Sequence, residues 1–565
     1  MNLNVAARAG RWSADHWKTA VSAWLAFCVV AAALGAVAGT KMLKQADTAA
    51  GETKQAEQLL SEAGFPNNAA ESVLVQSKSQ NLSDPAFRAT VADVVRTVSA
   101  LPQVQRVRSP LEPQNAGQVA KDRRSALVQF EIKGDQDEAD EKVQPILNAV
   151  ERVQQRHRSF TVAEFGFASA THELSDTLNE DFQRAEYSSL PVTLVILLVA
   201  FGALVAAGLP VLLAFSGVLA TIGLSSLASH VVAAGDPTKS VILLIGMAVG
   251  VDYSLFYLRR EREERARGLS PREALLKAAG TSGHAVFISG LTVLIAMAGM
   301  LFTGNAIFTS IAVGAMLMVA VALIGSLSIL PALLAKLGHR VDKGRIPLLG
   351  ARAGRESRLW GFVLDRVMRR PVLAAALSGG ALLALAVPTL TLHTQLPSFT
   401  DLPKSLPIVQ TYEAIQRAFP GAQTPAKVVI AADDVTSPQV QQAIAELKRR
   451  ALASGQMFEP ISTDINPKHT VETVSVSLQG DGSNGASVAA LKTLRERVIP
   501  ATVGAVPGVE AAVTGETAGT HDFNEQMKSH APLVFGFVLA LCFVLLLVTF
   551  RSIVIPIKAV LLNLL

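Results

Sequence analysis

Charged side chains are scarce in this sequence. Asp, Glu, Lys and Arg together make up 17% of its 565 residues, whereas hydrophobic residues make up 50%. Soluble domains carry about 25% charged residues, so this deficit excludes an ordinary soluble protein and indicates a membrane protein. The net charge is only +5, and the basic residues stand beside the ends of apolar runs. The sequence therefore predicts no nucleic-acid partner.

Cysteine is nearly absent, and the common enzyme motifs are missing. The two cysteines, Cys28 and Cys542, both fall inside apolar runs, which excludes a disulfide framework. There is no G-x-x-x-x-G-K-[ST] loop for nucleotide phosphates, and no H-E-x-x-H, C-x-x-C or G-x-S-x-G motif. The sequence predicts a protein that is not an enzyme and that holds no metal or organic cofactor. The remaining source of energy is a proton gradient, worth about 2.3 kcal/mol per charge per 100 mV.

Long apolar runs are abundant. A membrane-spanning helix needs about 20 predominantly apolar residues. Eight complete runs meet this requirement, and a ninth begins near 553 and continues to 565. The complete runs are residues 20–39, 188–207, 210–230, 239–258, 285–303, 306–335, 371–390 and 532–550. The sequence therefore predicts a polytopic α-helical membrane protein.

The distribution of positive charge predicts which side of the membrane each loop occupies. Basic residues gather in the N-terminal segment 1–19, in the connection 259–267 and in the linker 336–370. If the N-terminus is cytoplasmic, all three lie on the cytoplasmic side. We therefore expect a multi-pass protein of the cell inner (plasma) membrane, with periplasmic domains at 40–187 and 391–531.

The chain repeats one design. The residues at 199–201 read Val-Ala-Phe, and those at 548–550, 349 positions later, read Val-Thr-Phe. The same offset carries the run 20–39 to 369–388, which overlaps the run 371–390. The first half is thus 20–39, the domain 40–187 and the membrane segment 188–335, followed by the linker 336–370. The second half is 371–390, the domain 391–531, the run 532–550 and the start of a run at 553–565. Parallel repeats of this kind occur in transporters.

Both outer domains show the pattern of two β-α-β units, which predicts an α+β ferredoxin-like fold. Alternating apolar residues mark the strands, and apolar residues at helical spacing mark the helices. In the first domain the strands are expected at 72–76, 104–107, 126–132 and 161–165, and the helices at 85–101 and 137–155. In the second domain they are expected at 426–431, 471–478, 509–513 and, weakly, 457–463, with helices at 437–453 and 485–502.

An acidic residue, Asp252, stands inside the apolar run 239–258 and is followed by Tyr253. An ionised carboxylate within the membrane costs at least about 2.5–3.5 kcal/mol, and loss of water favours its protonated form. Asp252 is therefore our candidate for proton exchange, with Tyr253 as a hydrogen-bonding neighbour. The alternative is a structural ion pair, but no Lys or Arg lies in the middle of any predicted run.

Five other residues are weaker candidates. Gly246 and Gly250 are one helical turn apart, so they predict close packing of another helix. Ser289 and Thr292 are candidates for polar contacts, either across helices or back to their own helix. His284, at the cytoplasmic entry of its helix, is either a proton relay or an interfacial histidine.

These motifs resemble the MMPL transporters of actinobacteria, which belong to the resistance-nodulation-division (RND) superfamily. The resemblance rests on Gly246–Phe256, the Arg- and Glu-rich connection after it, Phe287–Val293, Leu330–Leu334 and Phe550–Asn563. It implies a twelve-helix RND-type fold with two periplasmic porter domains. It also implies export of lipids or other hydrophobic compounds, driven by protons that enter through Asp-Tyr pairs on the fourth and tenth helices.

Asp252 and Tyr253 match the first of those pairs. The repeat offset would put the second pair near position 601, past residue 565. The sequence therefore predicts a fragment of a longer product or a truncated gene. His284 stands where the family leads us to expect Arg.

Several other functions stay open. They are a non-transporting scaffold related to sterol-sensing proteins, an accessory of protein translocation similar to SecD and SecF, and an inactive truncated transporter. The expected partners are the membrane and a hydrophobic or lipid substrate. The oligomeric state is open, with a homo-oligomer among the expectations.

Overall fold

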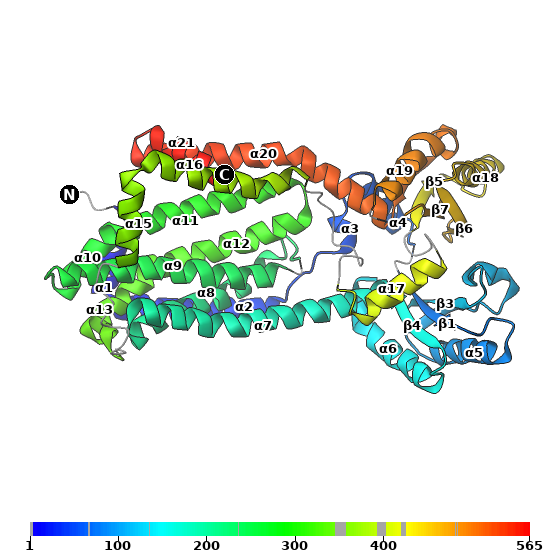
Figure 1. The fold of residues 1–565 in the computed structure, drawn as a ribbon, viewed down its shortest axis with the longest axis horizontal. Coiled ribbons are helices and arrows are strands. Elements are labelled where there is room, and N and C mark those ends of the chain that lie inside the picture. Colours follow the sequence, from blue (N-terminus) through cyan, green and yellow to red (C-terminus); the bar gives the residue numbers. More distant parts are fainter. Residues whose placement is uncertain are drawn as a thin grey trace. The chain divides into compact units, whose positions relative to one another are not determined.

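The computed structural model divides the chain into two compact units (Figure 1). The helical unit comprises residues 1–43, 182–393 and 527–565, and the sheet unit comprises residues 44–181 and 394–526. The described residues are 4–65, 68–134, 136–235, 237–344, 358–391, 403–419, 425–480, 482 and 484–564. Residues 345–357 of the predicted linker lie outside them.

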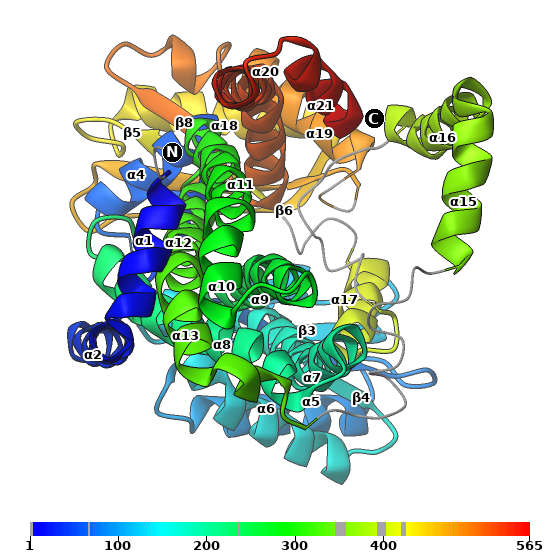
Figure 2. The same ribbon diagram turned by 90° about the vertical axis from the view of Figure 1, so that its left-hand side faces the viewer.

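The helical unit is built of long apolar helices, and Figure 2 shows α8, α9, α11 and α12 as a bundle seen end-on. Within the described residues, seven helices are long and apolar enough to cross a membrane. The bounds are α1 Val5–Asp15, α2 Trp17–Ala38, α8 Leu204–Ala228, α9 Thr238–Ala266, α10 Pro271–Gly280, α11 Ser282–Ala298, α12 Ala306–Ile324, α13 Leu330–Leu337, α15 Arg358–Arg369, α16 Pro371–Ala386 and α21 Val554–Leu564. The predicted polytopic α-helical fold is confirmed.

Small residues set how closely these helices approach. At the crossing of α2 and α8, a Cβ added to Gly35 would lie 2.5 Å from the Cα of Gly223. Such contact between backbones is open only to glycine, and it is how helices associate where no water drives them together.

Two helices of equal length carry the repeat. Helix α7 (Phe167–Phe201) and helix α20 (Glu516–Phe550) each have 35 residues. Each is followed directly by a residue with a left-handed backbone, Gly202 (φ +63) in the first copy and Arg551 (φ +47) in the second. The helix break at Gly202 falls inside the run 188–207, and the residues on both sides of Gly202 are apolar.

The sheet unit contains two four-stranded antiparallel sheets with the same strand order. The first sheet is β2-β3-β1-β4 and the second is β6-β7-β5-β8. The bounds are β1 Ala70–Gln76, β2 Val104–Arg108, β3 Ser125–Ile132, β4 Thr161–Gly166, β5 Ala426–Ala431, β6 Met457–Ile465, β7 Val471–Leu478 and β8 Glu510–Thr514. With their helices these sheets form the two ferredoxin-like porter domains, as predicted.

Each sheet has one face covered by its own helices. These are α5 (Pro85–Ser99) and α6 (Ala139–Arg156) in the first porter domain, and α18 (Pro438–Ala453) and α19 (Gly485–Thr493) in the second. The apolar residues at alternate positions of the strands, such as Val73 and Val128, pack against these helices. This alternation is what made the strands recognisable in the sequence.

The other face of each sheet is covered by a helix from the opposite half of the chain. Helix α17 (Pro407–Ala418) follows the second half's first membrane helix, yet Ile408 and Tyr412 pack on Leu74 and Phe165 of the first sheet. Helix α4 (Gly51–Glu62) belongs to the first half, yet it packs on the second sheet through a cluster of Ala56, Leu59, Val429, Val471 and Ala512. The two porter domains therefore exchange helices, an arrangement that we did not predict from the sequence.

Candidate functional site

Asp252 lies within α9, with apolar helix on both sides of it. Its side chain is exposed on the helical unit, and no hydrogen bond or ion pair joins it to another described residue. No Lys or Arg among the described residues therefore neutralises the carboxyl.

Tyr253, the next residue, points into the bundle. It is 6% exposed and packs with Val286, Leu323 and Leu327. Its hydroxyl forms no hydrogen bond of standard geometry with a described residue, although Ser289 of α11 lies beside it. A Cβ added to Gly290 would lie 3.3 Å from this hydroxyl, so α11 approaches it closely. The pair thus presents one exposed acid and one buried phenol from adjacent positions of a single helix.

Gly250 and Gly246, two and six residues before Asp252, face the neighbouring helices. A Cβ on Gly246 would lie 2.5 Å from Val218 Cγ2 of α8, and a Cβ on Gly250 would lie 2.9 Å from Ala214 Cβ of α8. The Gly246 position also abuts Met318 of α12. These two glycines let α9 pack tightly against α8 and α12 on the side away from Asp252.

The remaining candidates do not gather around Asp252. Thr292 donates to the backbone carbonyl of Ile288 at 2.9 Å, so its hydroxyl bonds back to its own helix. His284 lies partly exposed in the first turn of α11, where no hydrogen bond or ion pair to it is found among the described residues. Ser289 is the candidate that the structure brings next to Tyr253.

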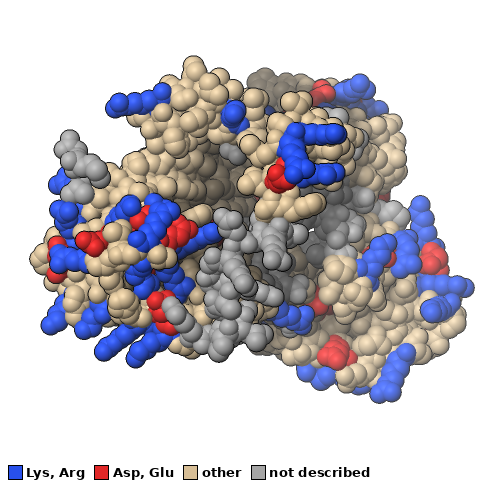
Figure 3. All heavy atoms as spheres, turned by 60° about the vertical axis from the view of Figure 1, so that its left-hand side comes forward, with Lys and Arg blue, Asp and Glu red and all other residues tan. Residues whose placement is uncertain are grey.

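The charged end of α9 carries a network of ion pairs that the sequence did not reveal. Glu264 is fully buried, and Arg260, Arg267 and Lys277 each approach it to 2.8 Å. The same end of α9 contacts Asp342 through two arginines, at 2.8 Å and 3.0 Å. Figure 3 shows basic and acidic side chains interleaved at this end of the helical unit. In a sequence, a mixed run of Arg and Glu predicts a solvent-exposed surface. The fold shows instead that the carboxylate of Glu264 is buried.

One of these arginines also ties α9 to α7. Arg262 donates to the carbonyl of Phe201, the last residue of α7, at 2.7 Å, and its guanidinium lies 5.2 Å from the centre of the Phe201 ring. The break after α7 therefore has a polar partner on α9. A shift of α9 along its axis would therefore alter the contacts of Arg262 with Phe201 at the end of α7.

The comparisons with known proteins agree on one family. The model of the MMPL family matches residues 41–374 and 400–565. The mycolic acid-containing lipids exporter MmpL11 of Mycolicibacterium smegmatis is 32% identical over 394 residues, which cover 68% of this chain and 41% of the relative. The putative membrane protein SCO6666 of Streptomyces coelicolor is 32% identical over 485 residues, covering 85% of this chain and 64% of the relative.

A third relative is the trehalose monomycolate exporter MmpL3 of Mycobacterium tuberculosis. It is 27% identical over 487 residues, which cover 80% of this chain and 50% of the relative. The chain thus spans less than two thirds of the length of these relatives. Because the family model matches nearly all of the sequence, the chain belongs to the MMPL family of the RND superfamily.

Proposed function

We propose that this protein exports lipids or other hydrophobic compounds across the inner (plasma) membrane, and that proton entry through Asp252 drives the export. Family membership and two relatives named as exporters of mycolic-acid lipids support the cargo class. The single observation that carries the coupling is Asp252, an acid on an apolar helix whose carboxyl has no described partner.

The proposed cycle depends on the free energy that an ionised side chain costs inside the membrane. The ionised Asp252 disfavours contact with lipid or with apolar helices by at least about 2.5–3.5 kcal/mol. Protonation removes that cost and favours a different packing of α9. Each proton that moves down a 100 mV potential supplies about 2.3 kcal/mol, which is of the same order. The tight contacts at Gly246 and Gly250 would transmit movement of α9 to α8 and α12.

Tyr253 and Ser289 are proposed to extend the proton path into the bundle. The Tyr253 hydroxyl lies beside Ser289 and lacks a standard hydrogen bond, so it is available to the neighbouring carboxyl or to water. His284 and Thr292 have no assigned part in this path. The N-terminus and the network around Glu264 are proposed to face the cytoplasm, since basic residues are concentrated on that side, and both porter domains the periplasm.

Asp252→Asn tests the coupling because it keeps the shape of the side chain and abolishes its proton exchange. Purified protein is reconstituted in liposomes with a fluorescent long-chain lipid, and both lipid movement and proton entry are followed after a pH gradient is imposed. We expect both rates to fall at least 100-fold. Asp365→Asn is the matched control, since Asp365 on α15 is exposed and pairs with Arg369 one turn away. It should change the rates less than twofold.

Gradient-driven lipid movement that survives in Asp252→Asn would overturn the proton-coupling proposal. A wild-type protein that moves neither lipid nor protons would instead favour the scaffold or the inactive alternative. Thermal unfolding of each variant shows whether a loss of transport reflects a loss of fold.

A further inference from the structure

A cavity of about 200 Å³ lies in the first porter domain, at the open edge of strand β4. Residues of α6, of α17 and of the first turns of α7 complete its walls. Figure 1 shows where these helices lie in the fold. Its apolar wall includes Leu147, Val150 and Ile408, and its acidic residues are Glu151, Glu164 and Glu173. No lysine or arginine is among the described residues that line it. The cavity is therefore apolar on one side and negative on the other.

The Glu164 carboxyl is buried at this cavity without a partner. The residue is 5% exposed, and neither carboxyl oxygen forms a hydrogen bond with any described residue. A buried polar group without a partner destabilises a fold. One explanation for such a group is a water or an ion that binds from outside the chain.

A second acid, Glu71, lies on the adjacent strand and on the same face of the sheet. Glu164 pairs in register with Val73, two residues along from Glu71. Unlike Glu164, Glu71 is well satisfied, because the hydroxyl of Ser169 donates to it at 2.6 Å and the amide of Ala168 donates at 2.7 Å. The Ser169 hydroxyl and the Ala168 amide thus bond to Glu71 and not to Glu164.

The second porter domain shows that the fold does not require these polar residues. Its register pairs Val428 with Val513 as the first pairs Val73 with Glu164. Gly166 and Gly515 each immediately precede one of the two 35-residue helices, which confirms the alignment. The equivalent positions are Glu164 and Val513, Glu71 and Ala426, and Ser169 and Ala518. All three residues of the second domain are buried in its apolar core.

Burial and neighbouring charge decide whether Glu164 is protonated. Burial, and then the charge of Glu71, raise the pKa of Glu164 well above its ordinary value. The other titratable residues that line the cavity are Glu151 on α6 and Glu173 on α7, whereas α17 contributes Pro407, Ile408 and Thr411. No Lys or Arg among the described lining residues is there to stabilise an ionised Glu164, and its burial favours the protonated form.

We propose that this cavity binds a small organic cation, an alkylammonium, whose charge is neutralised by Glu164 and whose chain packs on Leu147, Val150 and Ile408. The acidic lining disfavours carboxylates and phosphates, and a neutral alcohol would gain only a hydrogen bond. The volume is below the roughly 300–1,000 Å³ of pockets for drug-sized ligands, so a whole lipid does not fit. Binding releases the proton of Glu164, so the affinity should rise with pH. The proposal concerns a site separate from Asp252 and does not depend on transport.

The test is calorimetric titration of the full chain in lipid nanodiscs with hexylammonium, alongside hexanol as the neutral analogue of equal length. We expect hexylammonium to bind at least tenfold more tightly than hexanol, and more tightly at pH 8 than at pH 6. Glu164→Gln should weaken hexylammonium binding at least tenfold. Glu62→Gln is the matched control, since Glu62 lies exposed at the end of α4, and it should bind like the wild type.

A second variant separates binding from folding. Glu164→Val copies the second porter domain, so it should unfold at the same temperature as the wild type or higher while losing hexylammonium binding. Asp252→Asn should bind hexylammonium normally whatever its transport activity. Equal binding by Glu164→Gln, equal binding of hexanol, or no binding of hexylammonium to the wild type would each overturn the proposal.

Discussion

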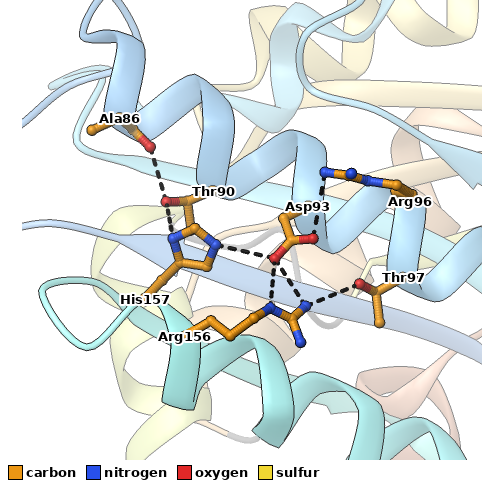
Figure 4. Close-up of polar contacts among 7 residues, drawn as sticks. All are labelled: Ala86, Thr90, Asp93, Arg96, Thr97, Arg156 and His157. Atoms are coloured by element: carbon orange, nitrogen blue, oxygen red, sulfur yellow. Dashed lines mark hydrogen bonds and ion pairs between the residues drawn. The ribbon is translucent and has the colours of Figure 1, made fainter.

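At the residue scale, Asp93 joins the two helices that cover the first sheet (Figure 4). Its carboxylate on α5 accepts from Arg156 Nη2 at 2.9 Å, and the Nε2 of His157 lies 3.1 Å from it. Burial alone would raise the pKa of Asp93, but the hydrogen bonds from Arg156 and His157 lower it below its ordinary value of 3.8. The ionised form is therefore the one that holds the end of α6 against α5.

We expect Asp93→Asn to weaken this contact by about 1–2 kcal/mol at neutral pH, since hydrogen bonds to charged groups contribute about that much or more. Hydrogen exchange of the amides in α5 and α6 measures the loss. The folded pKa is lowered, so the contribution is present above pH 3.8 and disappears as the pH falls through the folded value. Asp433→Asn, at an exposed residue of the second porter domain, should leave exchange unchanged. Unaltered exchange in Asp93→Asn would mean that the apolar packing of α5 and α6 suffices.

Glu71 predicts the opposite dependence on pH. Burial raises the pKa of Glu71 from 4.5 to about 7, although the hydroxyl of Ser169 and the amide of Ala168 oppose the shift. The folded chain keeps this proton where the unfolded chain has lost it. The stabilisation is therefore complete below pH 4.5 and is lost as the pH rises through about 7.

Hydrogen exchange in β1 and β4, corrected for the intrinsic effect of pH, should accordingly accelerate between pH 5 and pH 8. Strands β5 and β8 carry Ala426 at the position of Glu71, but the second sheet has its own buried acid, because Glu472 of β7 pairs with Ile430 and burial raises its pKa. Glu71→Gln should reduce the dependence on pH in the first sheet to the part that comes from Glu164. If Glu71→Gln left the dependence on pH of the first sheet unchanged, Glu71 would not be its source.

At the element scale, the crossing of α2 and α8 depends on glycines whose neighbours cannot move. A Cβ on Gly223 would run into the backbone carbonyl of Ala31, whereas a Cβ on Gly217, two turns earlier on α8, would meet only the ends of Met318 and Val321 at 3.4 Å and 3.5 Å. We expect Gly223→Ala to destabilise the protein by about 1–3 kcal/mol, the usual cost of overpacking. Gly217→Ala should be neutral or stabilising, because alanine favours a helix by roughly 1 kcal/mol. Thermal unfolding in detergent compares the two, and equal midpoints would contradict this account.

The elements of the porter domains were largely predictable from the sequence. The expected strands at 426–431 and 471–478 coincide with β5 and β7, because apolar residues at alternate positions report directly on a half-buried strand. The weakly predicted strand at 457–463 is β6, whose register shifts between Phe458 and Ile461 and so breaks the alternation. The break at Gly202 was harder to place, because it lies inside a continuous apolar run.

Some residues of the candidate sites could likewise be identified from the sequence, and others could not. Asp252 stood out because a charge inside an apolar run is conspicuous in a linear sequence. Glu71 and Glu164 did not stand out, because in the sequence each is one acidic residue within a strand. Only the register of β1 and β4 shows that they lie on the same face of adjacent strands, two residues apart in register. Glu264 was hidden for the same reason, among other charges. Sequence reasoning finds a residue that conflicts with its own segment, and misses one that conflicts only with distant neighbours.

At the scale of the whole molecule, the exchange of α4 and α17 binds the two halves of the repeat together within the sheet unit. An amphipathic helix shows that it covers a sheet, but its sequence does not say which one, so the exchange escaped prediction. The contact of α4 with the second domain is also ionic. Asp522 accepts from the amide of Thr53 at 2.8 Å at the start of α4, and Arg495 lies 3.0 Å from Glu52. Each porter domain is therefore completed by the other half of the chain.

The exchange predicts that neither half of the sheet unit is stable alone. Residues 44–181 expressed alone would leave Leu74, Leu127 and Phe165 exposed, since α17 normally covers them, and would carry α4 with no sheet to cover. We expect this segment to aggregate or to bind a hydrophobic dye. Produced together with residues 394–526, it should form a soluble one-to-one complex. Light scattering and dye fluorescence of the separate and combined segments measure the difference, with Ile415→Asp in α17 as the variant that should prevent rescue, because Ile415 is fully buried. A soluble, folded 44–181 segment that binds no dye would show that the apolar face under α17 is dispensable for folding.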